Sequence, residues 1–180
     1  MQLKEITKKS DDYVNVKKLY NRAFPAEEKA PFWLMMKKTK KENVDFWGLY
    51  DKEKWIGLAY VIRYNDLAYL FYLAIDDSQR GKGYGTKVMK LLQEKYMNFR
   101  LFLALETLDK NADNYNERVK RHNFYKRAGL TELPYHLREA MVVYDIMGTN
   151  GKIEPEEYGA LISDYIGGFL SKIFKMRIEK

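Results

Sequence analysis

Cysteine is absent from the sequence, and its absence excludes every function that needs a thiol. The 180-residue chain can form no disulfide, bind no metal through a thiolate and hold no acyl group on a cysteine. Apolar runs of the roughly 20 residues needed to cross a bilayer are also missing, as is an apolar signal segment in the first residues. We therefore expect a cytoplasmic protein in which any acyl transfer passes directly from donor to acceptor.

Histidine is scarce as well, because the sequence contains only His122 and His136. Neither stands at a metal-ligand spacing from the other or from a carboxylate, so we expect no metal site. Hydrophobic residues make up 46% of the chain, which is too many for a disordered protein. A length of 180 residues suits one domain with a sizeable core and room for an appendage.

Positive charge is in excess, with a formal net charge of +7. Such a charge is found in nucleic-acid-binding proteins, but here the basic residues are interleaved with acids along the chain. An anionic cofactor would be attracted by the same charge. We expect no nucleic-acid partner.

Hydrophobic periodicity predicts an alternation of strands and helices. The predicted strands are 3–6, 45–50, 55–62, 69–75, 99–105 and 140–147, and the predicted helices are 13–24, 31–36, 87–96 and 117–128. The strands on either side of helix 87–96 are nearly continuous apolar runs. Such strands are typical of a sheet that is covered on both faces.

The last part of the chain has a different pattern. From Tyr158 to Phe174, apolar residues fall at intervals that place them on a single helical stripe. Acidic residues precede this stripe and basic residues follow it, which complements a helix dipole. We expect a main domain over 1–147 and, over 148–180, a turn and a C-terminal amphipathic helix. This helix docks on its own domain or on a second subunit, and binding to a membrane surface is the weaker alternative.

The most informative stretch is 79–86, between the predicted strand 69–75 and helix 87–96. Its alternate glycines, Gly81, Gly83 and Gly85, allow the backbone to approach a ligand closely. Amides at a helix start attract negative charge, so this turn suits a phosphate-bearing ligand. The spacing fits neither a Walker loop nor a dinucleotide-binding fingerprint.

The pattern Arg80-x-x-Gly83-x-Gly85 resembles the acetyl-CoA-binding motif of the GNAT-type N-acetyltransferases. The resemblance extends over about 3–147 and implies an α/β fold. In this family a mixed, centrally splayed sheet of about six to seven strands carries helices on both faces, and acetyl-CoA is the co-substrate. The residues that the motif assigns to the CoA diphosphate are Arg80, Gly81, Lys82, Gly83, Tyr84, Gly85 and Thr86.

The resemblance also implies a bulge in the strand that precedes the glycine turn. The matching residues are Leu73, Ala74 and Ile75. In the family, amides freed by this bulge pair with the pantetheine arm and polarise the thioester carbonyl. A fixed N–H donor at that point stabilises the oxyanion that develops during acyl transfer.

A second segment, Phe124-Tyr125 followed by Gly129-Leu130, is similar to the family's Phe-Tyr-x-x-x-Gly-Phe pattern. The similarity implies that the Tyr125 hydroxyl protonates the departing CoA thiolate. The chain departs from the family at Arg118 and Arg121, where an asparagine and an alanine are common. Three roles are open for these arginines: contact with the cofactor phosphates, an ion pair with a carboxylate, or a solvated basic face of the helix.

Glu106 ends the predicted strand 99–105 at the edge where ligands of open sheets bind. It is the candidate base for the acceptor ammonium, and the alternative is an ion pair with Arg118 or Arg121. Candidates for an acceptor-binding region come from the segment before and within helix 31–36 and from strand 45–50. They are Glu27, Glu28, Trp33 and Trp47.

The resemblance to the GNAT family therefore implies an acetyl-CoA-dependent N-acetyltransferase. It would acetylate a primary amine, on a small molecule or a peptide, by direct attack in a ternary complex, and it could form a homodimer. The alternative is a non-catalytic acyl-CoA-binding module that acts through its C-terminal helix.

Overall fold

The computed structural model describes residues 1–26, 29–139, 142–167 and 176–179. The chain divides into two compact units, each formed by two separate stretches. The first comprises Met1–Ile62 and Leu70–Glu94, and the second comprises Arg63–Tyr69 and Lys95–Lys180. Strand β4 (Leu67–Ile75) begins in the second unit and ends in the first.

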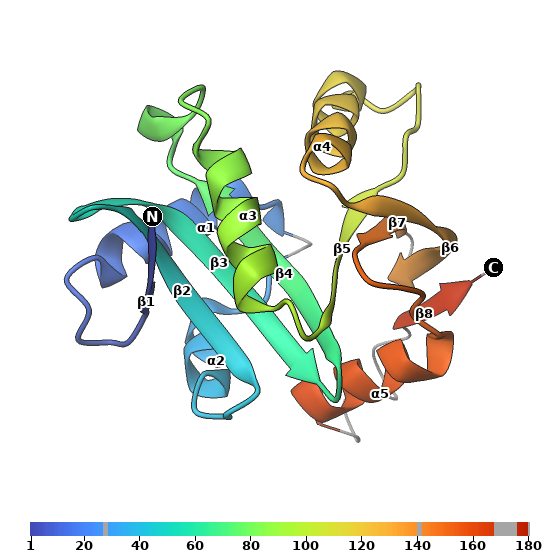
Figure 1. Cartoon of the computed structure of the whole chain (residues 1–180), viewed down its shortest axis with the longest axis horizontal. Helices are drawn as coiled ribbons and strands as arrows, with labels where there is room; N and C mark the ends of the chain where they lie inside the picture. The colour runs from blue at the N-terminus through green and yellow to red at the C-terminus, as the bar shows by residue number, and fades with distance from the viewer. Residues whose placement is uncertain (27–28, 140–141, 168–175, 180) are drawn as a thin grey trace. The chain divides into compact units, whose positions relative to one another are not determined.

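The first unit contains an antiparallel arrangement of β1 (Gln2–Glu5), β2 (Val44–Asp51) and β3 (Lys54–Tyr64), followed by β4. Its helices are α1 (Tyr13–Ala23), α2 (Phe32–Lys38) and α3 (Tyr84–Lys95). In Figure 1, α3 crosses in front of β3 and β4, and α1 lies behind them. Both faces of these strands are therefore covered, as the apolar sequence of β3 and β4 predicts.

An aromatic cluster fills the face that α1 and α2 cover. Tyr20 of α1 meets Tyr72 of β4 at a centroid distance of 5.0 Å, and Phe46 of β2 meets Tyr60 of β3 at 5.2 Å. Phe32 of α2 joins both groups. Edge-to-face contacts of this kind add to the burial of large apolar surfaces and fix the two helices on the sheet.

The second unit continues from the start of β4 through β5 (Arg100–Glu106), β7 (Val142–Gly148), β6 (Thr131–Glu139) and β8 (Met176–Glu179), in that hydrogen-bonded order. The β4–β5 pairing is parallel and the others are antiparallel. The parallel register covers only Leu67–Tyr69. So short a pairing is what a centrally splayed sheet requires, and the predicted fold class is confirmed.

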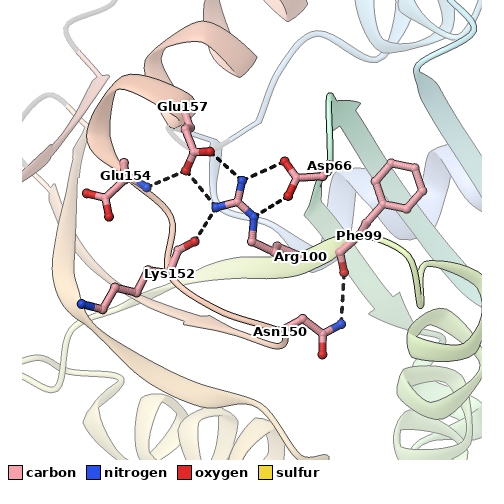
Figure 2. Close-up of polar contacts among 7 residues, drawn as sticks. All are labelled: Asp66, Phe99, Arg100, Asn150, Lys152, Glu154 and Glu157. Atoms are coloured by element: carbon pink, nitrogen blue, oxygen red, sulfur yellow. Dashed lines mark hydrogen bonds and ion pairs between the residues drawn. The ribbon is translucent and has the colours of Figure 1, made fainter.

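Helix α5 (Pro155–Ile166) packs within the second unit. Tyr158 is fully buried, with its ring 5.9 Å from that of Tyr69 and 6.4 Å from that of Phe102. Figure 2 shows Arg100 of β5 bound to Glu157, to Asp66 and to the Lys152 carbonyl. The predicted C-terminal helix is therefore present, and α5 docks on its own chain.

This helix is shorter than the sequence pattern suggests. It starts with a capping box between Glu154 and Glu157 and ends at Ile166, where Gly167 adopts φ +95°. The continuation of the apolar stripe to Phe174 lies outside the described residues. Strand β8 follows, and nothing in the sequence analysis anticipated it.

Strand β6 was also missed, because its sequence contains Pro134, which cannot donate to a ladder. The structure accommodates the proline in an irregular stretch between Glu132 and His136. Glu132 pairs with Met147 and His136 with Asp145, so β6 has extra residues opposite β7.

None of the helices in the described ranges is long and apolar enough to span a membrane.

Candidate functional site

The glycine turn lies in the first unit, between the short 3-10 helix η2 (Asp77–Gln79) and α3. Gly81 and Gly83 adopt φ +76° and +74°, which is the left-handed region that favours glycine. No neighbouring heavy atom lies within 4 Å of where a Cβ would stand at either glycine. The turn is therefore open where a side chain would stand at either glycine, and the first amides of α3 follow directly.

Basic side chains border this turn, and each already has a partner. Arg80 pairs with Asp77 at 2.9 Å, and Arg22 of α1 forms an ion pair with the same carboxylate at 2.7 Å. The Lys82 ammonium donates to the Ser78 carbonyl at 2.8 Å. These contacts are exposed, so they are weak enough for an anionic ligand to replace them.

Two side-chain contacts fix the ends of the turn. Asp76 accepts hydrogen bonds from the Ser78 hydroxyl and amide, at 2.6 and 3.1 Å, and these bonds, together with Arg22, lower the pKa of Asp76. The Tyr84 hydroxyl donates to Asp51 at 2.8 Å, which ties the start of α3 to the end of β2. This hydrogen bond raises the pKa of Tyr84.

The residues predicted to form the family's bulge, Leu73, Ala74 and Ile75, are the last three of β4. Ala74 is buried, and the other two are half-buried. Directly after them, the Asp76 amide donates to the Ile56 carbonyl of β3 at 2.9 Å. The role of these three residues toward a thioester stays a prediction.

Helix α4 (Tyr115–Arg127), in the second unit, carries Tyr125. The helix ends in a Schellman motif: the Leu130 amide donates to the Tyr125 carbonyl at 3.1 Å, and Gly129 adopts φ +91°. The Tyr125 side chain is half-buried against the Phe124 ring. Burial raises the pKa of Tyr125 to about 12, while the charge of Arg121 acts in the opposite direction.

Glu106, at the end of β5, pairs with both arginines that the sequence analysis had considered. Its Oε1 lies 2.9 Å from Arg118 and 3.2 Å from the Asn114 amide nitrogen, and its Oε2 pairs with Arg121. An ionised carboxylate offers about four acceptor positions, so one remains on Oε2. The predicted ion pair is therefore present, and the role of Glu106 as a base stays a prediction.

The two histidines lie on either side of Asp145 of β7. Nδ1 of His136 lies 3.0 Å from one carboxylate oxygen, and Nε2 of buried His122 lies 3.7 Å from the other. His122 Nε2 also bonds the Glu106 carbonyl at 3.0 Å. In the part of the chain that the structure describes, no group of three His, Cys, Asp or Glu residues could hold a metal ion.

Among the acceptor-site candidates, Trp33 projects from α2 with 67% of its surface exposed. Trp47 is half-buried in β2. Glu27 and Glu28 lie outside the described residues. The sequence analysis missed Arg22, which reaches Asp76 from 54 positions earlier in the chain and also pairs with Asp77; no local pattern could have indicated these contacts.

The glycine turn and α4 both lie in the part of the chain that identifies its family. A family model described as the acetyltransferase (GNAT) family matches residues 13–130, more than half of the chain. The chain belongs to the GNAT acetyltransferase family. It is therefore an acetyltransferase, and acetyl-CoA is its acetyl donor.

Solved structures show the same GNAT fold. A putative GNAT-family acetyltransferase from Bacteroides thetaiotaomicron is 20% identical, with a TM-score of 0.74 over 95% of this chain and 98% of that one. An aminoglycoside 6'-N-acetyltransferase complexed with coenzyme A is 15% identical, with a TM-score of 0.62 over 86% and 100%. A dodecameric spermidine N-acetyltransferase from Vibrio cholerae is 17% identical, with a TM-score of 0.62 over 93% and 96%. No curated protein matches the chain.

The glycine turn of this GNAT acetyltransferase fits the diphosphate of coenzyme A. Any side chain at Gly81 or Gly83 would occupy the open space beside the turn and would strain the positive φ. Arg80 and Lys82 place positive charge at the same turn. The turn therefore offers both the backbone donors and the charge that a diphosphate needs.

Proposed function

We propose that this GNAT acetyltransferase transfers the acetyl group of acetyl-CoA to a primary amine by direct attack in a ternary complex. The observation that carries the proposal is the open turn at Gly81 and Gly83, where left-handed backbone leads into the first amides of α3. The absence of cysteine supports direct transfer, because no cysteinyl intermediate can form. Acetyl-CoA supplies the activated acyl group and a thiol leaving group.

In this proposal the turn from Arg80 to Thr86 binds the diphosphate. Arg80 exchanges Asp77 for a phosphate, and the amides at the start of α3 act as additional donors. Leu73, Ala74 and Ile75 hold the pantetheine arm through their backbone groups. An N–H at the end of β4 then stabilises the oxyanion as the amine attacks the carbonyl carbon.

Tyr125 acts on the leaving sulfur. With a pKa of about 12, its phenol keeps its proton at neutral pH. A thiol has a pKa of about 8.5, so complete proton transfer from this phenol to a thiolate is uphill. Tyr125 therefore contributes mainly a hydrogen bond, donated as the sulfur becomes negative.

The amine must lose a proton, and Glu106 is our candidate to accept it. Its carboxylate keeps one acceptor position on Oε2, and that position could receive the proton directly or through a water molecule. Arg118, Arg121 and Asn114 fix the carboxylate in one orientation.

The acceptor belongs to the class of primary amines, as small molecules or peptides. Structural neighbours named for aminoglycoside and spermidine acetylation support this class without selecting a member. We further propose a cytoplasmic location, in line with the lack of cysteine, and a homodimer.

The test has two parts. Calorimetry should show binding of coenzyme A to the folded protein, and a library of primary amines should contain members that release free thiol from acetyl-CoA. Dephospho-CoA and pantetheine serve as controls, since pantetheine lacks the diphosphate and should bind far more weakly. Coenzyme A binding without thiol release across the library would favour the non-catalytic module, and no binding would refute the proposal.

A further inference from the structure

Gly57 of β3 faces the end of β4 at a distance that no side chain permits. A Cβ built on Gly57 would overlap the Ala74 carbonyl oxygen and would lie 3.1 Å from Ile75 Cα and 3.2 Å from the Ala74 carbonyl carbon. All of these are backbone atoms of buried or half-buried residues, so they cannot rotate away. Glycine is therefore required at this position for the observed course of β4.

Gly48 of β2 provides the contrast. A Cβ built there would lie 2.8 Å from Ile6 Cδ1 and 2.9 Å from Tyr50 Cε2. Both are side-chain atoms, which can move without a shift of any strand backbone. The two glycines lie on paired strands of the same unit, yet only the one at 57 limits the position of another strand's backbone.

The Ala74–Ile75 peptide links Gly57 to the candidate catalytic amide. The described residues contain no cis peptide bond, so the Ala74 carbonyl and the Ile75 N–H point in opposite directions. The carbonyl lies against Gly57, and the next amide, that of Asp76, donates to Ile56 on the same side. The Ile75 N–H therefore points away from β3, toward the other edge of β4.

We propose that Gly57 is a positioning residue for acetyl transfer. By leaving room for the Ala74 carbonyl, it sets the angle of the Ala74–Ile75 peptide and so aims the Ile75 N–H at the thioester carbonyl. This inference rests on the proposed function, because it assumes that the end of β4 receives the thioester. Gly57 itself touches no substrate and acts only through the peptide opposite.

A methyl group at position 57 should impair the chemical step more than cofactor binding. Relieving the overlap requires a backbone shift of about 1 Å, and a misplacement of that size in a catalytic group costs on the order of 100-fold in rate. We expect the glycine turn to keep its conformation, because the overlap falls on Ala74 and Ile75 and no atom lies within 4 Å of a Cβ built at Gly81 or Gly83. A purely structural role would instead lower stability and leave the chemistry of the folded fraction unchanged.

The experiment compares Gly57→Ala with the matched control Gly48→Ala in the full chain. We expect Gly57→Ala to lower kcat by about 10- to 100-fold, with the Kd of coenzyme A within about threefold of wild type, and Gly48→Ala to keep wild-type kcat. Acetyl-CoA labelled with ¹³C at the carbonyl gives a second readout without an acceptor. Its resonance should move downfield on binding to wild type and to Gly48→Ala, and less so on binding to Gly57→Ala.

Wild-type kcat and an unchanged ¹³C shift in folded Gly57→Ala would overturn the proposal. If that variant does not fold, the proposal is tested on the ¹H chemical shift of the Ile75 amide in the wild type. This resonance should lie further downfield with acetyl-CoA bound than with coenzyme A bound. Equal chemical shifts in the two complexes would overturn the proposal. Failure of the proposed function is distinguishable, because the wild type would then release no thiol with any amine.

Discussion

Arg100 and Glu157 form a two-point ion pair, with Nη1 2.9 Å from Oε2 and Nη2 2.6 Å from Oε1 (Figure 2). The other edge of the guanidinium binds both oxygens of Asp66. One side chain at the start of β5 thus joins the β3–β4 turn to the first turn of α5. Planar guanidinium groups suit this paired geometry, which lysine cannot reproduce.

Arg100→Gln should therefore lower the free energy of unfolding. Arg100 is 19% exposed, so we expect a loss of about 1–2 kcal/mol, at the lower end for hydrogen bonds to charged groups because solvent screens Asp66. Urea denaturation measures this change in the free energy of unfolding. Lys4→Gln is the control, since its pair with Glu53 is exposed and should contribute below about 0.5 kcal/mol.

Acid should remove the same stabilisation. Hydrogen bonds from Arg100 lower the pKa values of Asp66 and Glu157 in the folded protein. Groups with a lowered folded pKa stabilise the fold above their unfolded pKa values of about 4 and lose that effect as the pH falls toward the folded values. Between pH 5 and pH 2.5, wild type should thus lose more stability than Arg100→Gln. Equal losses of unfolding free energy in wild type and Arg100→Gln over this pH range would contradict this account.

Gly83→Ala should weaken coenzyme A binding. Position 83 has φ +74° and open space around it, so the alanine meets a conformational cost of about 1 kcal/mol and no overlap. Relief of that strain would turn the amides away from the diphosphate, and we expect a Kd about tenfold higher by calorimetry. Gly159→Ala, within α5 and equally open, should keep the Kd and raise stability by about 0.5–1 kcal/mol.

Asp77→Asn should have the opposite effect on affinity. Asp77 pairs with both Arg80 and Arg22, so its carboxylate competes with an incoming phosphate. Loss of its charge should lower the Kd of coenzyme A by about threefold, with a steeper dependence on salt. Glu53→Gln removes an acid elsewhere in the same unit and serves as the control. Weaker binding by Asp77→Asn would show that the carboxylate orients Arg80 productively.

Tyr125→Phe should lower kcat by more than about tenfold, with the Kd of coenzyme A unchanged. Because burial raises the pKa of Tyr125 to about 12, the phenol should not ionise between pH 7 and pH 10. The wild-type rate should then show no alkaline decline from this residue. Tyr115→Phe, in the first turn of the same helix, controls for loss of a hydroxyl. Full activity in Tyr125→Phe would exclude Tyr125 from the mechanism.

The glycine turn and the C-terminal end of α4 could be predicted because their causes are local. Gly81 and Gly83 adopt the φ values for which glycine is suited, and Gly129 ends α4 by the same property. The missed strand β6 has a local cause as well. Pro134 interrupts its pattern, and only pairing with β7 shows that the strand continues past it.

Local residue patterns predicted the order of most elements and the glycine turn, and the composition alone excluded cysteine chemistry. The folded structure was needed to show that Glu106 pairs with Arg118 and Arg121 and that Gly57 lies against the Ala74 carbonyl. These contacts join residues far apart in the chain. Their distances depend on how strands and helices pack, and no local pattern of residues encodes that packing.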